Sequence, residues 1–342
     1  MNLKQSIKSI FKRSESYVLL IIIVFSAFVT MINPAFLTLD NLFDLLRSSS
    51  GTAILGIGVF LVLVSGGVDV SCTTIAIVSQ YVSVNLMIRM GIDNIWFIFG
   101  LASLIGITLG AINAVFVSIF KLPTLIVTLG TSSLYHGAML EFFGTRSVNV
   151  GDLPRSIKAF GTYNVITLHR GDGTPYGLSV FFVILLALLV ITFLILKFTM
   201  VGRGVYAVGG NLEAAERAGF NTRKTHFFIY MYAGLLAGIM GVIHLSLIRY
   251  SNPNYIVGDE MMVIAAVVLG GARISGGSGT LTGTMLGVIL VSILQKNLIM
   301  MGLSTYWQQF FIGVVLILGV SITYLQAKLQ DSGRTIIVKE QE

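Results

Sequence analysis

The sequence predicts an all-α fold, a polytopic bundle of about ten transmembrane helices with both termini in the cytoplasm. Of the 342 residues, 55% are hydrophobic and only 11% are charged, and the mean hydropathy is +0.89. A soluble globular chain has roughly 25% charged residues, so most of this surface is expected to face lipid. The chain also contains a series of apolar stretches separated by polar or glycine-rich segments. Each stretch is a candidate span, because a span needs about 20 apolar residues and fewer where it is buried in a bundle.

The N-terminus is basic and then apolar, a pattern that a signal peptide shares. No small-x-small cleavage site follows the apolar run, so we expect an uncleaved first span after a basic cytoplasmic segment, residues 1–16. Two of the predicted spans are short, and these either extend into their flanks or are broken helices inside the protein. The predicted spans are residues 17–32, 51–65, 73–90, 96–119, 122–143, 178–198, 227–248, 260–269, 281–294 and 306–325.

The distribution of Lys and Arg sets the expected orientation. With the N-terminus inside, most basic residues fall in cytoplasmic segments, and the short outside loops hold only Arg47, Arg89 and Arg249. Four more lie in a long extracytoplasmic loop, 144–177, where this rule is weak, and Lys296 is ambiguous. The net charge of +7 therefore indicates membrane orientation, and no nucleic-acid partner is expected. With this orientation, the predicted organisation is a transmembrane domain, 17–325, followed by a cytoplasmic tail, 326–342.

Glycine spacing predicts close helix packing. Several predicted spans carry two glycines four residues apart, which places both on one face and lets backbones approach. These pairs are Gly106 with Gly110, Gly234 with Gly238, and Gly283 with Gly287. Residues 66–71 also resemble residues 270–275, with two glycines, a charge and a serine in the same order. Many transporters have repeated halves, but one six-residue echo leaves both a repeat and a coincidence open.

One polar stretch, 202–219, stands apart from the apolar background and falls in a predicted cytoplasmic loop, 199–226. Asn211 is a good N-cap residue, because its side-chain oxygen can accept a bond from a free N–H of the first turn. Glu213 and Arg217 carry the charges that the helix dipole favours at the two ends. Gly219 can take the left-handed conformation that stops a helix. We therefore expect a separate helix of about two turns, held outside the membrane.

Catalytic signatures are missing from the sequence. No phosphate-binding loop of the form GxxxxGK[ST] and no GxSxG motif occurs. The four histidines have no metal-ligand spacing to one another, and Cys72 is the single cysteine. The sequence therefore predicts no catalytic residue, no cofactor, no metal site and no ATPase site of its own.

Several polar residues fall at membrane depth, and Asp69, Ser71 and Asn113 are the candidates for a solute pathway. A polar group in hydrocarbon is costly unless it faces the bundle interior or a water-filled path. The alternative role is a hydrogen bond that only holds helices together, and it stays open for each of them. Further polar residues in or near the spans are Gln80, Asn85, His136 and His244.

Four stretches in the expected order resemble one family of membrane proteins. They are SGGVDVS (65–71), GAINAVFVSIFKLPTLIVTLGT (110–131), GRGVYAVGGNLEAAERAGF (202–220) and IAAVVLGGARISGGSGTLTGTMLG (264–287). Together they resemble the inner-membrane permease subunits of bacterial sugar ABC importers, of the type that carries ribose, xylose, arabinose or galactose. Branched-chain amino-acid permeases share the fourth stretch in looser form, and the first stretch favours the sugar branch.

This chain departs from the family pattern at two places. Cys72 and Thr73 follow the first stretch where the family has Val-Gly, and Ala114 follows Asn113 where the family has Gly. If this region lines the pathway, the departures affect solute choice, so the resemblance does not name the sugar.

The resemblance implies a multi-pass permease in the bacterial inner membrane that moves a pentose or hexose by alternating access. Its implied partners are a cytoplasmic ATP-binding subunit, a second permease copy (identical or a sister chain), an extracytoplasmic solute-binding protein and membrane lipid. The polar stretch resembles the coupling helix through which such a permease contacts its ATPase. In this chain the residues of that coupling loop are Gly209, Gly210, Asn211, Glu213, Ala214, Ala215 and Gly219. The alternatives are a permease for a nucleoside or branched-chain amino acid, and an ATP-independent secondary transporter.

Overall fold

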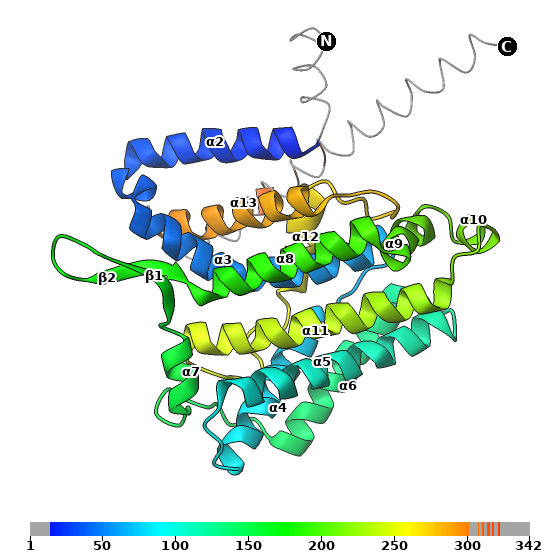
Figure 1. The fold of residues 1–342 in the computed structure, drawn as a ribbon, viewed down its shortest axis with the longest axis horizontal. Coiled ribbons are helices and arrows are strands. Elements are labelled where there is room, and N and C mark those ends of the chain that lie inside the picture. The colour runs from blue at the N-terminus through cyan, green and yellow to red at the C-terminus, as the bar shows by residue number, and fades with distance from the viewer. Residues whose placement is uncertain are drawn as a thin grey trace, which may run out of the picture.

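The computed structural model describes residues 14–300 and, after them, residues 307, 310, 313, 314, 317 and 321. The predicted tail, 326–342, lies outside the described residues, as do nearly all of the basic segment 1–16 and most of the predicted span 306–325. Within the described part, long helices lie side by side in stacked layers and run between two ends of the molecule (Figure 1).

The helices follow the predicted spans closely. They are α2 (Ser14–Ile32), η1 (Pro34–Leu37), α3 (Leu39–Val64), α4 (Cys72–Arg89), α5 (Ile95–Ser118), α6 (Thr124–Phe143), α7 (Arg155–Phe160), α8 (Val180–Phe198), α9 (Met200–Gly210), α10 (Leu212–Arg217), α11 (Thr222–Ile248), α12 (Glu260–Leu269) and α13 (Leu281–Met300). Among the described residues, α2, α3, α5, α8 and α11 are long and apolar enough to cross a membrane, and α12 and α13 contribute shorter apolar helices. The number of spans and their orientation in the membrane stay predictions.

The two short predicted spans have different outcomes. The span predicted at 51–65 extends into its N-terminal flank, which is one of the two expected outcomes: α3 begins at Leu39, where Thr38 caps the helix by accepting from the Asn41 N–H. Its polar first turns are paired across the fold, since Asp44 forms an ion pair with Lys296 over 2.7 Å. The second short span, α12, keeps the predicted bounds and remains only ten residues long.

The prediction of one short helix within 202–219 is incomplete, because two helices occupy this stretch. The unexpected one is α9, which buries Val205 and Val208 on one face. Its glycines permit close contact, since a Cβ on Gly204 would lie 2.8 Å from the Thr225 Oγ1 atom. Tertiary packing therefore overrides the low helix propensity of glycine here.

The all-α prediction is wrong within the loop 144–177, which contains helix α7 and an antiparallel hairpin. Strand β1 (Asn164–His169) pairs with β2 (Pro175–Ser179) and protrudes from one end of the molecule (Figure 1). At the hairpin turn Asp172 Oδ1 accepts from the Thr174 N–H over 2.9 Å, and Gly173 has φ +83°. This Asp-Gly pair between residues with strand propensity is the hairpin signal in the sequence.

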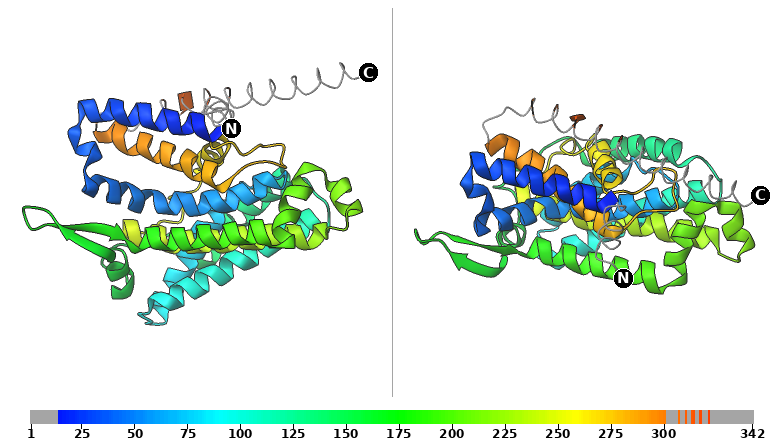
Figure 2. Two further views of the ribbon diagram at one scale, coloured as in Figure 1. Left: turned by 45° about the horizontal axis from the view of Figure 1, so that its top comes forward. Right: turned by 90° about the horizontal axis from the view of Figure 1, so that it is seen from above.

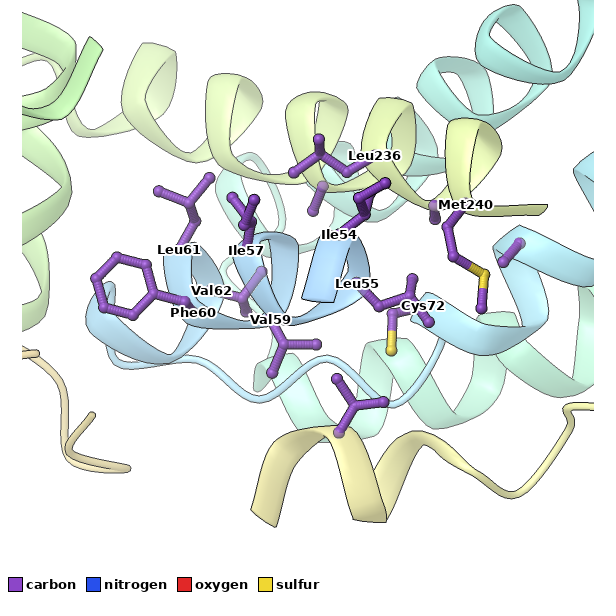
Figure 3. Close-up of a cluster of buried hydrophobic side chains, with 14 of the residues drawn as sticks. Ile54, Leu55, Ile57, Val59, Phe60, Leu61, Val62, Cys72, Leu236 and Met240 are labelled. Atoms are coloured by element: carbon purple, nitrogen blue, oxygen red, sulfur yellow. The ribbon is translucent and has the colours of Figure 1, made fainter. Parts of the chain in front are cut away.

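Helix α3 is the centre of the core. In the most apolar stretch of α3, 83% of the residues are buried inside the protein, whereas the same share in α2, α5 and α8 is 11–22%. Figure 3 shows side chains of α3, among them Ile54 and Ile57, facing Leu236 and Met240 of α11. The poorly buried helices therefore present apolar surface outward, as lipid or a membrane partner requires.

The glycine pairs predicted to pack do so. A Cβ on Gly106 of α5 would overlap the Gly234 carbonyl of α11, and a Cβ on Gly238 would overlap the backbone of α5. The same relation holds between Gly283 of α13 and Gly270, the residue that follows α12. These contacts bring helix backbones together at distances that a side chain would prevent.

The molecule has two distinct ends. Helices α9 and α10 lie at one end, and the hairpin lies at the other (Figures 1 and 2). The start of α11 joins the first end, where Ser118 Oγ donates to the Arg223 carbonyl. Lys296, ambiguous in the sequence, lies with Asp44 near the hairpin end. Where the structure describes them, the Lys and Arg residues predicted to face the cytoplasm belong to helices and loops that meet at the end of the molecule where α9 lies (Figure 1).

Candidate functional site

The break between α3 and α4 is built from satisfied backbone groups. After α3, the Gly66 N–H donates to the Leu63 carbonyl and the Gly67 N–H to the Val62 carbonyl, over 2.9 and 3.0 Å. Gly66 has φ +84°, which glycine adopts without strain. The helix thus ends in a Schellman motif, and the chain continues through residues 67–71 without regular structure.

Threonines of α6 hold this break. Thr124 Oγ1 accepts from the Val68 N–H over 3.1 Å, and Thr128 Oγ1 accepts from the Val70 N–H over 3.2 Å. Irregular backbone is tolerated inside a membrane only where protein or enclosed water satisfies its polar groups. In the sequence these threonines, one turn apart in TLIVTLGT, look like ordinary helix residues, so only the structure reveals that they hold the break.

The three residues predicted to form a solute pathway come together in one hydrogen-bonded cluster. Ser71 Oγ donates to Asp69 Oδ1 over 2.6 Å, and Asn113 Nδ2 donates to Ser71 Oγ over 2.8 Å. Tyr135 Oη extends the chain by donating to Asn113 Oδ1 over 3.1 Å. Asp69 is 2% exposed and both Ser71 and Asn113 are fully buried, so in this structure the cluster joins the α3–α4 break to α5 and α6 and faces no open channel.

Sequence reasoning missed Glu260 as a polar group near this cluster. Its Oε2 atom accepts from Thr73 Oγ1 over 2.7 Å and from the Gly258 N–H over 3.0 Å. Glu260 opens α12 and is partly buried, and it links that helix to the start of α4. An ionisable residue at the start of a short apolar span was the available signal.

The remaining polar residues named in the sequence gather near the hairpin end. Gln80 Nε2 donates to Ser251 Oγ over 3.1 Å, and His244 Nδ1 lies 3.1 Å from Gln80 Oε1. His136 Nε2 lies 3.2 Å from the Pro253 carbonyl, and Asn85 bonds within its own helix. The contacts of Gln80 and His136 fasten the segment between α11 and α12 to α4 and α6.

The predicted coupling helix is α10, and its caps are as the sequence predicts. Asn211 Oδ1 accepts from the Ala214 N–H over 2.9 Å. Gly219 has φ +86°, and the Phe220 N–H donates to the Ala215 carbonyl over 3.0 Å. Glu213 lies 3.8 Å from Arg217 in the same helix, and both side chains are more than 80% exposed.

Exposure separates the seven predicted coupling residues into two groups. Ala215 is buried and Gly209 is half-buried, so both face the protein. The others are exposed at the tip of the molecule, namely Gly210, Asn211, Glu213, Ala214 and Gly219. Helix α10 therefore presents all but one of its side chains outward on a short, capped element.

Comparison with known proteins agrees with this architecture. Residues 41–320 match the family model described as branched-chain amino acid transport system / permease component. The chain is 30% identical to ribose import permease protein RbsC of Escherichia coli (strain K12) over 309 residues, which is 90% of this chain and 93% of that protein. It is 31% identical to the protein of the same name from Haemophilus influenzae over 311 residues, 90% of this chain and 91% of that one.

A second group of relatives carries a different name. The chain is 32% identical to autoinducer 2 import system permease protein LsrC of Enterobacter sp. (strain 638) over 316 residues, 92% of this chain and 88% of that protein. No solved structure matches the chain significantly. These matches confirm the resemblance found in the sequence motifs. The chain therefore belongs to this transport-system permease family and is a multi-pass ABC importer permease of the bacterial inner membrane.

Proposed function

We propose that this chain is the permease subunit through which an ABC importer carries a monosaccharide, a pentose or a hexose, across the cytoplasmic membrane. The observation that carries the proposal is similarity to ribose import permeases over nearly the whole length of both chains. Autoinducer 2 is the second candidate solute, because the chain is equally similar to permeases of that name. In this proposal no bond in the solute is broken and ATP is hydrolysed by a partner, because the sequence contains no GxxxxGK[ST] phosphate-binding loop.

The proposed energy input is a separate cytoplasmic ATPase that docks on α10. This helix is short, capped at both ends and exposed on every residue except Ala215, which supports a docking role. Leu212 is 43% exposed and, with Ala214, offers apolar contact at the tip. Closure of the ATPase around bound nucleotide would push α10 and change which side of the membrane the solute site faces.

The proposed pathway runs beside the break between α3 and α4. Asp69, Ser71 and Asn113 satisfy one another in this structure, so we place them in the wall of a closed pathway. An opening of the break would free their hydroxyl, amide and carboxylate groups, which suit the hydroxyl groups of a sugar. The departures at Cys72, Thr73 and Ala114 lie directly beside this wall.

The proposed assembly has three further partners. A second permease copy, identical or a sister chain, would pack on part of the exposed apolar helices, and lipid would cover the rest. A solute-binding protein would deliver the solute at the hairpin end, opposite α10 (Figure 2). These assignments follow the family and the two-ended shape.

The solute class is tested by uptake in cells that express the chain together with an ATPase subunit and a solute-binding protein of the same importer. We expect uptake of labelled ribose, with competition from other pentoses or hexoses and weak competition from leucine and uridine. Cells with the two partners but without this chain are the control. Uptake of leucine or uridine that no sugar reduces would contradict the proposal.

A further inference from the structure

Three segments that are distant in the sequence meet at the end of the bundle where α9 lies. They are the residues after α3, the C-terminal end of α9, and the loop between α12 and α13. The Gly277 N–H donates to the Val64 carbonyl over 2.8 Å and so joins the loop to the end of α3. We call the contact among Gly66, Gly209, Gly276 and Gly277 the glycine junction.

At three of its four positions the glycine junction has no room for a side chain, and at Gly66 the φ of +84° itself favours glycine. A Cβ on Gly209 would overlap the Val64 carbonyl, and a Cβ on Gly276 would lie 2.6 Å from the Gly209 oxygen and 2.7 Å from Gly66 Cα. Real Cβ atoms essentially never approach other atoms within 3.0 Å, so the junction is backbone against backbone. Because no rotatable side chain lies between the segments, a shift of α9 is not absorbed by a change of rotamer.

The junction connects the exposed helix to the buried cluster by a short route. On one side, Asn211 is the single residue between α9 and α10. On the other side, residues 67 and 68 separate Gly66 from Asp69, the carboxylate that Ser71 binds. A displacement of α10 therefore has a direct backbone path to the polar cluster.

The third segment gives the junction a second arm. Tyr206 of α9 donates from its Oη atom to the Gly279 carbonyl over 3.3 Å. The loop that contains Gly279 joins α12 to α13, and α12 carries Glu260, which accepts from Thr73 at the start of α4. Helix α9 thus contacts the breaks after α3 and after α12. The first continues directly into α4, and the second is connected to α4 through Glu260 at the opposite end of α12.

We propose that Gly209 is a positioning residue for transport, because it keeps α9 in backbone contact with both breaks so that movement of α10 opens the α3–α4 break. The inference rests on the proposed function, since it needs an ATPase that moves α10. A Gly209→Ala substitution would force α9 away from the Val64 carbonyl while leaving the exposed face of α10 unchanged. The ATPase would still bind, and its nucleotide cycle would no longer reach the break.

Cys72 offers a native reporter of the break. It follows Ser71, is 4% exposed and is the single cysteine of the chain. The experiment measures the rate at which a small methanethiosulfonate reagent modifies Cys72 in the full complex with its ATPase subunit, without nucleotide and with ATP plus vanadate. In the unsubstituted complex we expect the two rates to differ by at least about fivefold, a typical coupling factor between sites.

The Gly209→Ala complex should keep its ATPase subunit on purification, yet show the same Cys72 rate with and without nucleotide. The matched control is Gly137→Ala, a helical glycine of α6 at which an added Cβ meets nothing within 4 Å. A nucleotide response in Gly209→Ala equal to the control overturns the inference, and so does loss of the ATPase subunit from that variant. The inference is also overturned if nucleotide leaves the rate of Cys72 modification unchanged in the unsubstituted complex.

A second substitution covers the case in which Gly209→Ala does not fold. Gly277→Ala introduces a milder overlap, 2.9 Å from Gly210 Cα, and its control is Gly173→Ala, which has a similar φ of +83° and open space around it. Loss of the nucleotide response in Gly277→Ala alone supports the junction, and equal responses overturn it. ATP-driven uptake by the unsubstituted complex is measured in parallel, so failure of the proposed function is seen separately.

Discussion

Asn211 shows how much one side chain decides at the residue scale. Its β-region backbone and its bond to the Ala214 N–H set the first turn of α10, and its own N–H bonds the Ala207 carbonyl and ends α9. One residue thus separates two helices and fixes their relative direction. The angle at which α10 leaves the bundle therefore depends on the Asn211 side chain.

We expect Asn211→Ala to weaken α10, because loss of an N-cap costs about 1 kcal/mol of helix stability. Co-purification of the ATPase subunit should fall several-fold while the purified chain keeps its thermal unfolding midpoint. Asn94→Ala is the matched control, since Asn94 also N-caps its helix, α5, by accepting from the Trp96 N–H. Equal ATPase binding by the two variants would show that α10 is not the docking element.

Asp69 provides the second prediction at this scale. Asp69→Ala would leave both the N–H and the hydroxyl of Ser71 without their acceptor, at a cost of about 1–3 kcal/mol for each unsatisfied buried group. Asp69→Asn keeps an acceptor oxygen and should unfold at nearly the original detergent or heat midpoint. An Asp69→Asn variant that is stable yet imports slowly would support a role of the carboxylate in the pathway. Normal import by both Asp69→Ala and Asp69→Asn would show that the carboxylate has no such role.

At the element scale, helix packing depends on places where a side chain is missing. Gly106→Val should separate α5 from α11 and lower the thermal midpoint, because overpacking a core contact costs typically about 1–3 kcal/mol. Gly100→Val is the control on the same helix, since an added Cβ there meets nothing within 4 Å. Similar midpoints for the two variants would refute the close α5–α11 contact.

Helix α7 is positioned by charged groups from three other elements. Asp93, in the loop before α5, accepts from the Ser156 N–H over 2.8 Å. At the opposite end of α7, Arg47 donates to the Gly161 carbonyl, and Arg249 donates to the Lys158 carbonyl over 3.2 Å. An acid at the N-terminus and cations at the C-terminus complement the helix dipole.

This arrangement predicts a pH dependence for α7. The hydrogen bonds from Ser156 hold the pKa of Asp93 below its usual range, so the folded state prefers the carboxylate. Its contribution is present above the unfolded pKa of about 3.9 and is lost as the pH falls through the lower folded value. The amide protection factors of residues 155–160, which correct for the intrinsic exchange rate at each pH, should therefore fall below about pH 4, and Asp93→Asn should remove that dependence. Protection factors of the Asn variant that still fall in the same range would assign the effect to another group.

At the scale of the whole molecule, hydropathy and capping predicted most of the helices, because a span must satisfy its own backbone bonds. The exact start of α3 was not predictable from hydropathy, since residues 39–50 mix polar and apolar side chains, and polar ones are stabilised by partners far along the chain, such as Lys296 for Asp44. Helix α9 was missed for a related reason, because packing against α3 and α11 compensates its glycines. The threonines that hold the break were visible in the sequence but indistinguishable from ordinary helix residues.

The echo between 66–71 and 270–275 has a structural counterpart shifted by one residue. Gly66 and Gly271 both have positive φ, +84° and +96°. Each glycine and the residue after it also donate the same pair of hydrogen bonds to the end of the preceding helix. The two loops meet at the glycine junction, so the echo marks equivalent turns at one end of the bundle. The sequence echo pairs Gly66 with Gly270, whereas the structure pairs Gly66 with Gly271. The two pairings differ because the first segment has a serine, Ser65, where the second has Gly270.

The central claim, that ATP hydrolysed by a partner drives solute through this chain, is tested most directly by the energy source of uptake. Proteoliposomes would contain the chain and its ATPase subunit, with the loaded binding protein added outside. Only vesicles with ATP trapped on the α10 side should accumulate labelled ribose, and an ionophore should leave that uptake unchanged. Uptake that persists without ATP and collapses with the ionophore would contradict the account.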